Sequence, residues 1–293
     1  MKFLRSFHPY AMVTILFWSL AYVLTRLVLQ YVTAYSLGFL RYAVASLVLA
    51  VVCLFQSMRR VEKRDIWLFL LSGICGFFLY MITFNVGAST VTAATSSVVI
   101  ASAPVFTALL ASIFFGERLV PHQWAAIGIE FAGILILTLY GAIFSLNMGT
   151  VWLALAAMLL SCYNLLQRKL TRSYTALQST AYSIFIGTIL LACFAPRAVV
   201  ELRTAPMEPL FYIVVLGVFS SAIAYLLWSK ALERAPRTSL VSNYMFFTPF
   251  LTALLGFLLA GEMPEAYTWA GGGLILLGSL IFNFGGLLEK NQK

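Results

Sequence analysis

The chain has 293 residues, of which 62% are hydrophobic and only 10% are Asp, Glu, Lys or Arg, and its formal net charge is +9. An average soluble domain carries about 25% charged residues, so this composition excludes a soluble globular protein and indicates an integral membrane protein. The positive charge does not indicate a nucleic-acid partner, because the basic residues lie in short segments between long apolar stretches.

Ten apolar stretches follow one another along the chain, each of roughly 19–25 residues, the length that crosses a hydrocarbon core. Each is expected to be a helix, because a bilayer offers no water to open backbone groups. The connections are short, so we predict an all-α integral membrane protein with ten transmembrane helices and no sizeable soluble domain. The predicted spans are residues 9–29, 35–57, 66–86, 89–113, 121–141, 150–168, 175–195, 208–231, 237–260 and 265–288.

The basic residues are concentrated at both ends of the chain and in alternate loops. Examples are Arg5, Arg59, Arg118, Lys169 and Lys230. Cytoplasmic loops of membrane proteins carry an excess of Lys and Arg. We therefore expect both termini in the cytoplasm and the lipid bilayer as a partner of the chain.

One phrase occurs twice in the sequence. Residues 104–117 read PVFTALLASIFFGE and residues 249–262 read PFLTALLGFLLAGE, at an offset of 145 that also relates Tyr80 to Tyr225. An internal repeat of this period indicates two copies of one structural unit, which we place at residues 1–145 and 146–293. Each copy holds an odd number of spans, so the copies are expected to have inverted topology.

The earlier parts of the two copies align at an offset of 142. The alignment is weaker there, but it relates residues of the first span to residues of the sixth. The related pairs are Ser19 and Ser161, Tyr22 and Asn164, Arg26 and Arg168, and Thr33 and Thr175.

These motifs resemble the EamA type of the drug/metabolite transporter superfamily. In that family a proline, an apolar run and Gly-Glu end the fourth helix of each repeat, as in residues 104–117 and 249–262; Trp18-Ser19 and Phe39-Leu40-Arg41 also fit. The resemblance implies a bundle of two inverted five-helix repeats around a central cavity. Spans one, three, four, six, eight and nine would line the cavity, and spans five and ten would lie at the periphery. It also implies a location in the bacterial inner membrane. The oligomeric state is left open between a monomer and a homodimer.

Aromatic and polar side chains at helical spacing in the cavity-lining spans are the candidates for substrate contact. Trp18 and Tyr22 share one face of the first span, and Tyr80 and Thr83 share one face of the third. Aromatic rings with a few amides suit an amphipathic or organic-cation substrate, although packing or interfacial aromatic residues give the same pattern. The predicted cavity residues are Trp18, Tyr22, Tyr80, Thr83, Thr95, Asn164, Tyr225, Trp228 and Asn243.

Pro104 and Pro249 lie inside spans four and nine, at matched positions of the repeat. A proline inside a helix removes one hydrogen bond and clashes with the carbonyl four residues earlier. We expect the pair to act as hinges or kinks beside the pathway; the alternative is a static bend that shapes packing.

Three charged residues lie well inside predicted spans, and one of them, Arg26 near the outer end of span one, is expected to extend its side chain to the outer interface. Glu130, near the middle of span five, is a candidate for proton coupling, because an intramembrane carboxylate can carry a proton or bind a cation. Span five is peripheral in the resembled family, so a bond between helices or across a dimer interface is the alternative. Arg41, in span two, is expected to bond backbone carbonyls or a neighbouring helix.

Motifs for catalysis and metal binding are missing from the sequence. Both histidines, His8 and His122, lie at predicted ends of spans, and the four cysteines lack metal-ligand spacing, so we expect no metal and no cofactor. There is no ATPase motif, so energy must come from a gradient, with protons as one candidate. We expect a secondary transporter that exports small metabolites, such as amino acids or amphipathic organic compounds, by alternating access. The alternatives are a membrane-embedded enzyme and a non-transporting membrane partner or sensor, neither of which needs two-fold pseudosymmetry.

Overall fold

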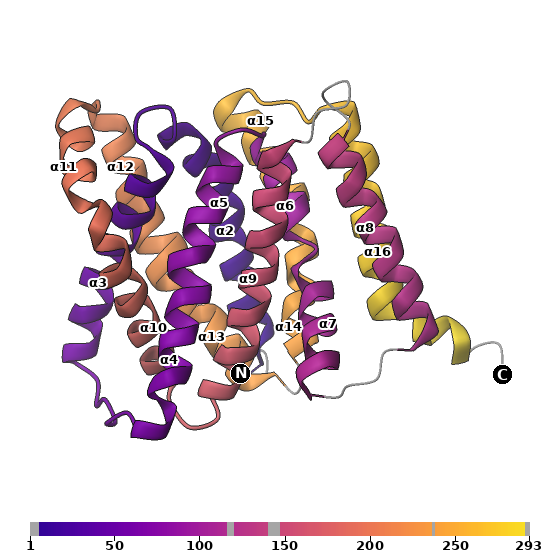
Figure 1. The fold of residues 1–293 in the computed structure, drawn as a ribbon, viewed down its shortest axis with the longest axis horizontal. Coiled ribbons are helices and arrows are strands. Elements are labelled where there is room, and N and C mark those ends of the chain that lie inside the picture. Colours follow the sequence, from indigo (N-terminus) through magenta and orange to yellow (C-terminus); the bar gives the residue numbers. More distant parts are fainter. Residues whose placement is uncertain (1–5, 116–119, 140–146, 236–237, 291–293) are drawn as a thin grey trace.

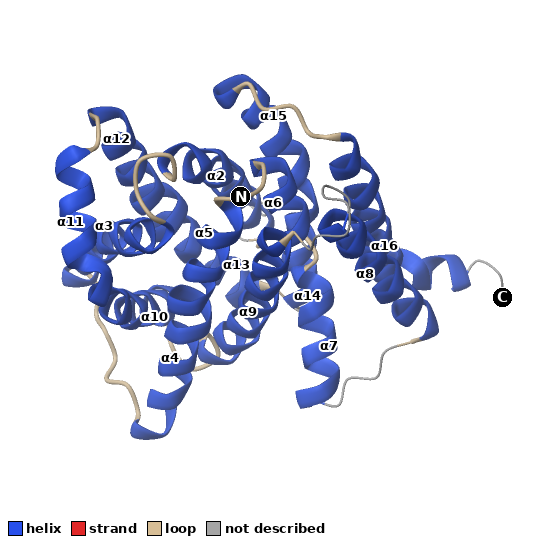
Figure 2. Ribbon diagram, turned by 45° about the horizontal axis from the view of Figure 1, so that its top comes forward, coloured by secondary structure: helices blue, strands red, loops and turns tan. Residues whose placement is uncertain are grey.

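The computed structural model describes residues 6–115, 120–139, 147–235 and 238–290. Every regular element in these ranges is a helix, and no strand occurs among them (Figures 1 and 2). Within the same ranges, seven helical stretches are long and apolar enough to cross a membrane, and shorter apolar helices accompany them. Helical segments fall in each of the spans predicted from the sequence, although several spans are interrupted.

The helices follow one another along the chain with short connections. The first part forms α2 (His8–Val28), α3 (Ala34–Leu54), η1 (Lys63–Asp65), α4 (Ile66–Gly73), η2 (Ile74–Leu79), α5 (Tyr80–Ala88), α6 (Ala93–Ile100), α7 (Ala103–Phe115) and α8 (Pro121–Leu139). The second part forms α9 (Met148–Leu170), α10 (Ala176–Leu191), η3 (Ala192–Phe194), α11 (Ala195–Thr204), α12 (Met207–Val215), η4 (Leu216–Ile223), α13 (Ala224–Arg234), α14 (Thr238–Ser242), η5 (Asn243–Phe247), α15 (Thr248–Ala260) and α16 (Ala266–Lys290).

Equivalent threonines start equivalent helices in the two parts of the chain. Thr33 precedes α3, and its hydroxyl accepts a hydrogen bond from the Ser36 backbone N–H at 3.4 Å. Thr175 precedes α10 and accepts one from the Gln178 backbone N–H at 3.2 Å. Such a cap satisfies one of the N–H groups that the first turn of a helix leaves unpaired.

Two of the long helical stretches contain a π-helical segment at similar positions, η2 between α4 and α5 and η4 between α12 and α13. Each segment contains a glycine against which another helix packs closely. A Cβ atom on Gly76 would lie 2.3 Å from the Tyr163 ring, and one on Gly217 would lie 2.5 Å from Val44. Because π-helical segments are rare and often mark functional sites, their matched occurrence directs attention to the residues beside them.

Both proline-bearing stretches are broken just before the proline. α6 ends at Ile100 and α7 begins at Ala103, so Pro104 is the second residue of α7. Pro249 is the second residue of α15, which follows the 3-10 segment η5. A proline is tolerated in the first turn of a helix, where its missing N–H would lack a partner in any case. Each proline therefore begins a helical segment instead of interrupting one.

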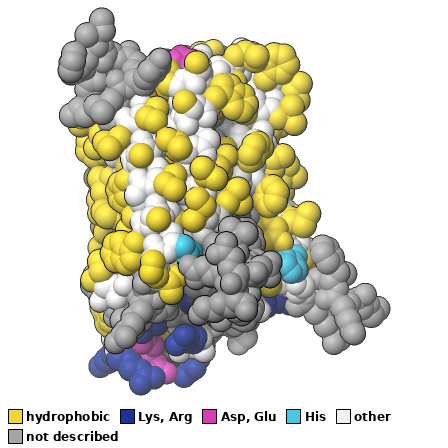
Figure 3. All heavy atoms as spheres, turned by 90° about the vertical axis from the view of Figure 1, so that its right-hand side faces the viewer, with side chains coloured by type: hydrophobic (Ala, Val, Ile, Leu, Met, Phe, Trp, Pro, Cys, Tyr) yellow, Lys and Arg dark blue, Asp and Glu magenta, His cyan; other side chains and the backbone are white. Residues whose placement is uncertain are grey.

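α8 and α16 lie side by side at one edge of the bundle (Figures 1 and 2) and pack mainly on each other. Their contact is close at two glycines: a Cβ atom on Gly133 would lie 2.6 Å from the Gly271 carbonyl oxygen, and one on Gly278 would lie 2.5 Å from Cγ of Glu130. The flank of the molecule turned to the viewer in Figure 3 is covered largely by hydrophobic side chains, with Lys and Arg side chains at its lower end. Such a surface suits contact with lipid tails.

Candidate functional site

Five aromatic side chains from four helical segments meet inside the bundle. The Trp18 ring, on α2, lies 5.1 Å from the ring of Tyr225 and 4.9 Å from that of Trp228, both on α13. The Phe77 ring, on η2, lies 5.0 Å from the ring of Tyr225 and 5.1 Å from that of Tyr163, on α9. All five side chains are buried. We call this set, Trp18, Phe77, Tyr163, Tyr225 and Trp228, the aromatic cluster.

A second aromatic group connects α2 with α5. The Phe84 ring lies 5.4 Å from that of Tyr22 and stacks on that of Tyr80 at 5.7 Å. Tyr80 follows η2 directly, as its repeat counterpart Tyr225 closely follows η4. These rings are also buried, so a substrate can reach either group only when the surrounding helices separate.

Asn164, on α9, holds the indole of Trp228. The indole N–H of Trp228 donates a hydrogen bond of 3.0 Å to the Asn164 side-chain oxygen. The Asn164 side chain is fully buried, and its Nδ2 has no hydrogen-bond partner among the described residues. A buried amide N–H without a partner costs about 1–3 kcal/mol, so Asn164 is prepared to donate to a group that enters the site.

Arg41 lies beside the same cluster, on α3. Its Nε donates to the Ser221 hydroxyl at 2.5 Å and its Nη2 to the Ser220 carbonyl at 3.4 Å, both on η4. The indole N–H of Trp18 donates to the same Ser220 carbonyl at 3.2 Å. The expectation that Arg41 bonds a backbone carbonyl and a neighbouring helix is confirmed, and the helix is the π-helical segment η4.

Two of the other predicted cavity residues, Thr83 and Thr95, bond elsewhere in the bundle, and nothing is described of the side chain of a third, Asn243. The Thr83 hydroxyl donates to the carbonyls of Leu79 and Tyr80 at 2.9 and 3.0 Å, within its own helical stretch. The Thr95 hydroxyl lies 2.9 Å from that of Thr268, on α16, and so faces the α16 side of the bundle. Asn243 begins η5, and its side chain lies outside the described part of the structure.

Two serines that the repeat relates bond the helix breaks before the prolines. Each serine hydroxyl donates to a backbone carbonyl in the other half of the chain. The Ser161 hydroxyl, on α9, donates to the Ala103 carbonyl at 2.7 Å. The Ser19 hydroxyl, on α2, donates to the Thr248 carbonyl at 3.5 Å. Each carbonyl belongs to the residue immediately before a proline, so the residues that the repeat relates make the same kind of contact twice.

Arg26 and Arg168, which the repeat also relates, each bond the end of another helix. The two helices concerned, α5 and α13, end at opposite ends of the bundle (Figure 1). Arg26 Nη1 donates to the Ser89 carbonyl at 2.6 Å, just after α5, and its Nε lies 3.5 Å from Oε1 of Glu262. Arg168 donates to the Ala235 carbonyl at 2.7 Å, just after α13. A cation at the carboxyl end of a helix interacts favourably with the helix dipole.

Glu130 lies in the contact between α8 and α16, away from the aromatic cluster. Its side chain is 1% exposed, and its Cγ is the atom that a Cβ on Gly278 would meet. Its repeat counterpart Ile275 occupies the corresponding place against Gly133. The structure therefore places Glu130 between two helices at the edge of the bundle.

A model of the EamA-like transporter family matches the chain twice, over residues 6–139 and 147–284. The chain belongs to the EamA-like transporter family. The resemblance to the drug/metabolite transporter superfamily predicted from the sequence motifs is thereby confirmed, and the EamA-like chain is a multi-pass membrane protein.

Relatives of this EamA-like chain have transporter names. It is 30% identical over 271 residues to the "Probable terminal-alkyne amino-acid exporter" of Streptantibioticus cattleyicolor, with 92% of this chain and 91% of that protein covered. It is 23% identical to the "S-adenosylmethionine uptake transporter" of Rickettsia bellii, with 84% and 82% covered. A solved crystal structure superposes with a TM-score of 0.64 at 19% identity, covering 95% of this chain and 97% of that one. At that identity the likeness concerns the fold.

Sequence reasoning missed Phe77 and Tyr163 of the aromatic cluster in this EamA-like protein. Tyr163 directly precedes the predicted Asn164, whereas Phe77 lies inside η2, which has no signal in the sequence. Neither was singled out because an isolated aromatic residue in an apolar span is ordinary.

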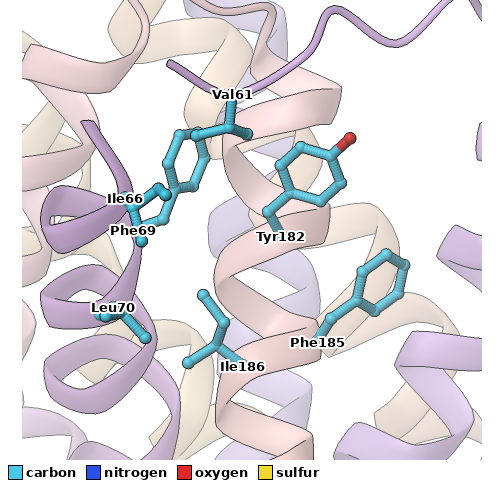
Figure 4. Close-up of a pocket in the computed structure, with 7 residues that line it drawn as sticks. All are labelled: Val61, Ile66, Phe69, Leu70, Tyr182, Phe185 and Ile186. Atoms are coloured by element: carbon cyan, nitrogen blue, oxygen red, sulfur yellow. The ribbon is translucent and has the colours of Figure 1, made fainter. Parts of the chain in front are cut away.

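A separate apolar groove of about 280 Å³ lies between α4 and α10 (Figure 4). None of the predicted cavity residues lines it, and it offers few polar groups to orient a ligand. Its lining residues are Val61, Ile66, Phe69, Leu70, Tyr182, Phe185 and Ile186.

Proposed function

We propose that this EamA-like protein is a secondary transporter that exports small metabolites by alternating access. In this proposal ten transmembrane helices form two inverted repeats, residues 1–145 and 146–293, with both termini on the cytoplasmic side of a bacterial inner membrane. The repeats rock around the aromatic cluster and open it to one side at a time. Pro104 and Pro249 serve as the hinges, because the helix ladder is already interrupted beside them.

The observation that carries the proposal is the pair of contacts made by Ser161 and Ser19. Each serine lies on the first helix of one half and bonds the carbonyl before the proline of the other half. Alternating access opens the two ends of the pathway in turn. The same kind of contact in both halves supports such an alternation. A membrane enzyme or a sensor has no use for it.

Amino acids and amphipathic organic compounds are the proposed substrates. The aromatic cluster provides several buried rings, and Asn164 adds an amide donor within it. Such a site suits a substrate with an apolar body and a small polar end. The name of the Streptantibioticus relative, an amino-acid exporter, supports the same class.

Purified protein in proteoliposomes tests the proposal. Flux of a panel of amino acids and organic cations is measured with and without an imposed pH gradient, against vesicles without protein. We expect at least one amino acid or amphipathic compound to cross faster than it crosses empty vesicles. Folded protein that moves nothing in the panel contradicts transport.

We also propose that Glu130 carries the coupling proton, if the flux depends on the pH gradient. Glu130→Gln keeps the shape of the side chain and cannot bind and release a proton. We expect this variant to transport down a substrate gradient and to lose its response to the pH gradient. An unchanged response would assign Glu130 to the contact between α8 and α16 instead. Ile275→Gln is the matched control, because it changes the equivalent place on α16 without removing a carboxylate.

A further inference from the structure

One buried cation, Arg41, lies beside the aromatic cluster without an ion pair among the described residues. The Arg41 residue is 3% exposed, and in the described part of the chain no carboxylate lies within ion-pair distance of it. Arg41 is the eighth residue of α3, so it lies about 10 Å along that helix from its first residue at 1.5 Å per residue. Arginine remains protonated inside proteins, so the bundle holds a full positive charge at this depth.

The described partners of Arg41 are neutral. They are a hydroxyl and a carbonyl of η4, which accept from Nε and Nη2, while a guanidinium carries five N–H donors. A buried charge is costly unless an opposite charge compensates it, and an arginine inside a membrane is expected to serve a substrate or ion pathway. The donors that remain can serve an anion.

The position of Arg41 joins it to the predicted cavity. It shares the Ser220 carbonyl with Trp18, and the ring of the next residue on α3, Tyr42, lies 5.3 Å from the Phe77 ring of the aromatic cluster. The charge therefore lies beside Trp18, a member of the aromatic cluster.

A second donor, Asn164, is connected to Trp18 through Trp228. The Trp18 ring contacts Trp228, whose indole N–H occupies the Asn164 oxygen and leaves Asn164 Nδ2 without a partner among the described residues. An arginine and an amide N–H₂ both donate, so together they match a group that only accepts.

We propose that Arg41 binds the carboxylate of the transported substrate, with Asn164 as a second donor and the aromatic cluster around the apolar part. The proposal rests on the proposed transport function and specifies its substrate class as monocarboxylates with an apolar body, which includes amino acids. A phosphate group carries about −1.5 to −2 charges and would leave charge uncompensated by one arginine. A single carboxylate balances the positive charge of Arg41.

The test compares acids with their primary amides in proteoliposomes. The probes are L-phenylalanine, L-propargylglycine and their amides, and the quantity measured is the ratio of acid flux to amide flux. For the wild type we expect a ratio of at least about tenfold, the effect of about 1.4 kcal/mol. Arg41→Gln should bring the ratio close to one. Arg41→Lys keeps the charge without the planar fork and should give an intermediate ratio, which provides a second measurement where Arg41→Gln fails to fold.

Arg26→Gln is the matched control, because it removes an arginine that bonds carbonyls away from the cluster. It should change acid and amide flux together and leave their ratio unchanged. If Arg41 only braces η4, the Arg41 variants will lower both fluxes alike at a constant ratio, and the proposal is overturned. Flux of organic cations with no carboxylate transported at all would overturn it too, while leaving transport itself intact.

Discussion

At the scale of single residues, the site depends on hydrogen bonds whose partners are both buried. The bond between Trp228 and Asn164 is the clearest case, since both side chains are fully buried and come from different helices. A buried bond of this kind contributes modestly when it is made, but breaking one partner leaves the other without solvent or protein to replace it. The bond therefore fixes the Trp228 ring against Trp18.

Trp228→Phe is expected to destabilise the protein by about 1–3 kcal/mol, because the Asn164 oxygen loses its donor. Adding Asn164→Leu should recover part of that loss, since two apolar groups replace two polar ones. Trp124→Phe is the control, as Trp124 is 57% exposed on α8. Thermal unfolding in detergent provides the measurement. A double variant less stable than Trp228→Phe would show that the bond is not the cause.

At the scale of helices, the repeat reappears in the contact between α8 and α16. Gly133 and Gly278 correspond at the offset of 145, and each faces the other helix at close range. Gly128 and Gly273 correspond in the same way, yet a Cβ atom on either would meet nothing within 4 Å. The repeat thus provides two pairs of glycines in the same two helices, one pair in close contact with the other helix and one pair facing open space.

Gly133→Ala and Gly278→Ala should each destabilise the protein by about 1–3 kcal/mol, the usual effect of overpacking. The clash at Gly133 is with a backbone carbonyl, which cannot rotate away. Gly128→Ala and Gly273→Ala should be neutral or stabilise the helix by up to about 1 kcal/mol. Melting temperatures of the four purified variants decide the matter. Equal effects in both pairs would mean that helix propensity, and not the contact, controls stability.

The positions of the helices follow from the sequence more completely than their interruptions do. Span length and polarity depend on the bilayer and can be read residue by residue. The π-helical segments η2 and η4 have no such signal; each contains a glycine, Gly76 or Gly217, that a side chain from a distant helix approaches, and such tertiary contacts cannot be read from one span. The breaks before Pro104 and Pro249 were foreseeable as irregularities, but the position of each proline in the first turn of a new helix was not.

At the scale of the whole molecule, the sequence predicted which helices contribute to the site better than which side chains do. Trp18, Tyr225, Trp228 and Asn164 come together, whereas Thr95 contacts α16. Rotation of a helix about its own axis decides between these outcomes, and in an almost uniformly apolar span the hydrophobic pattern does not fix that rotation. Arg41 shows the same limit, since its place beside Trp18 depends on how α2, α3 and η4 pack.

The contacts of Arg26 lead to a prediction about the conformational equilibrium of the transporter. They connect α2 with the end of α5 and with Glu262, and so hold one end of the bundle together. Under alternating access, Arg26→Gln should favour the state open at that end. Thr25, the preceding residue, is fully buried, so a cysteine placed there in a background without native cysteines reports the opening.

In the proposed orientation, with both termini cytoplasmic, this end of the bundle faces outward, so labelling of Thr25→Cys by a membrane-impermeant maleimide added outside cells measures its opening. Arg26→Gln should raise the labelling rate about threefold to tenfold, because it removes hydrogen bonds from a charged group and a partly exposed ion pair. Arg168→Gln is the control from the opposite end of the bundle, and it should leave the rate unchanged or lower it, since opening one end closes the other. Equal increases in both variants would indicate general loosening of the helices and would argue against two exchangeable ends.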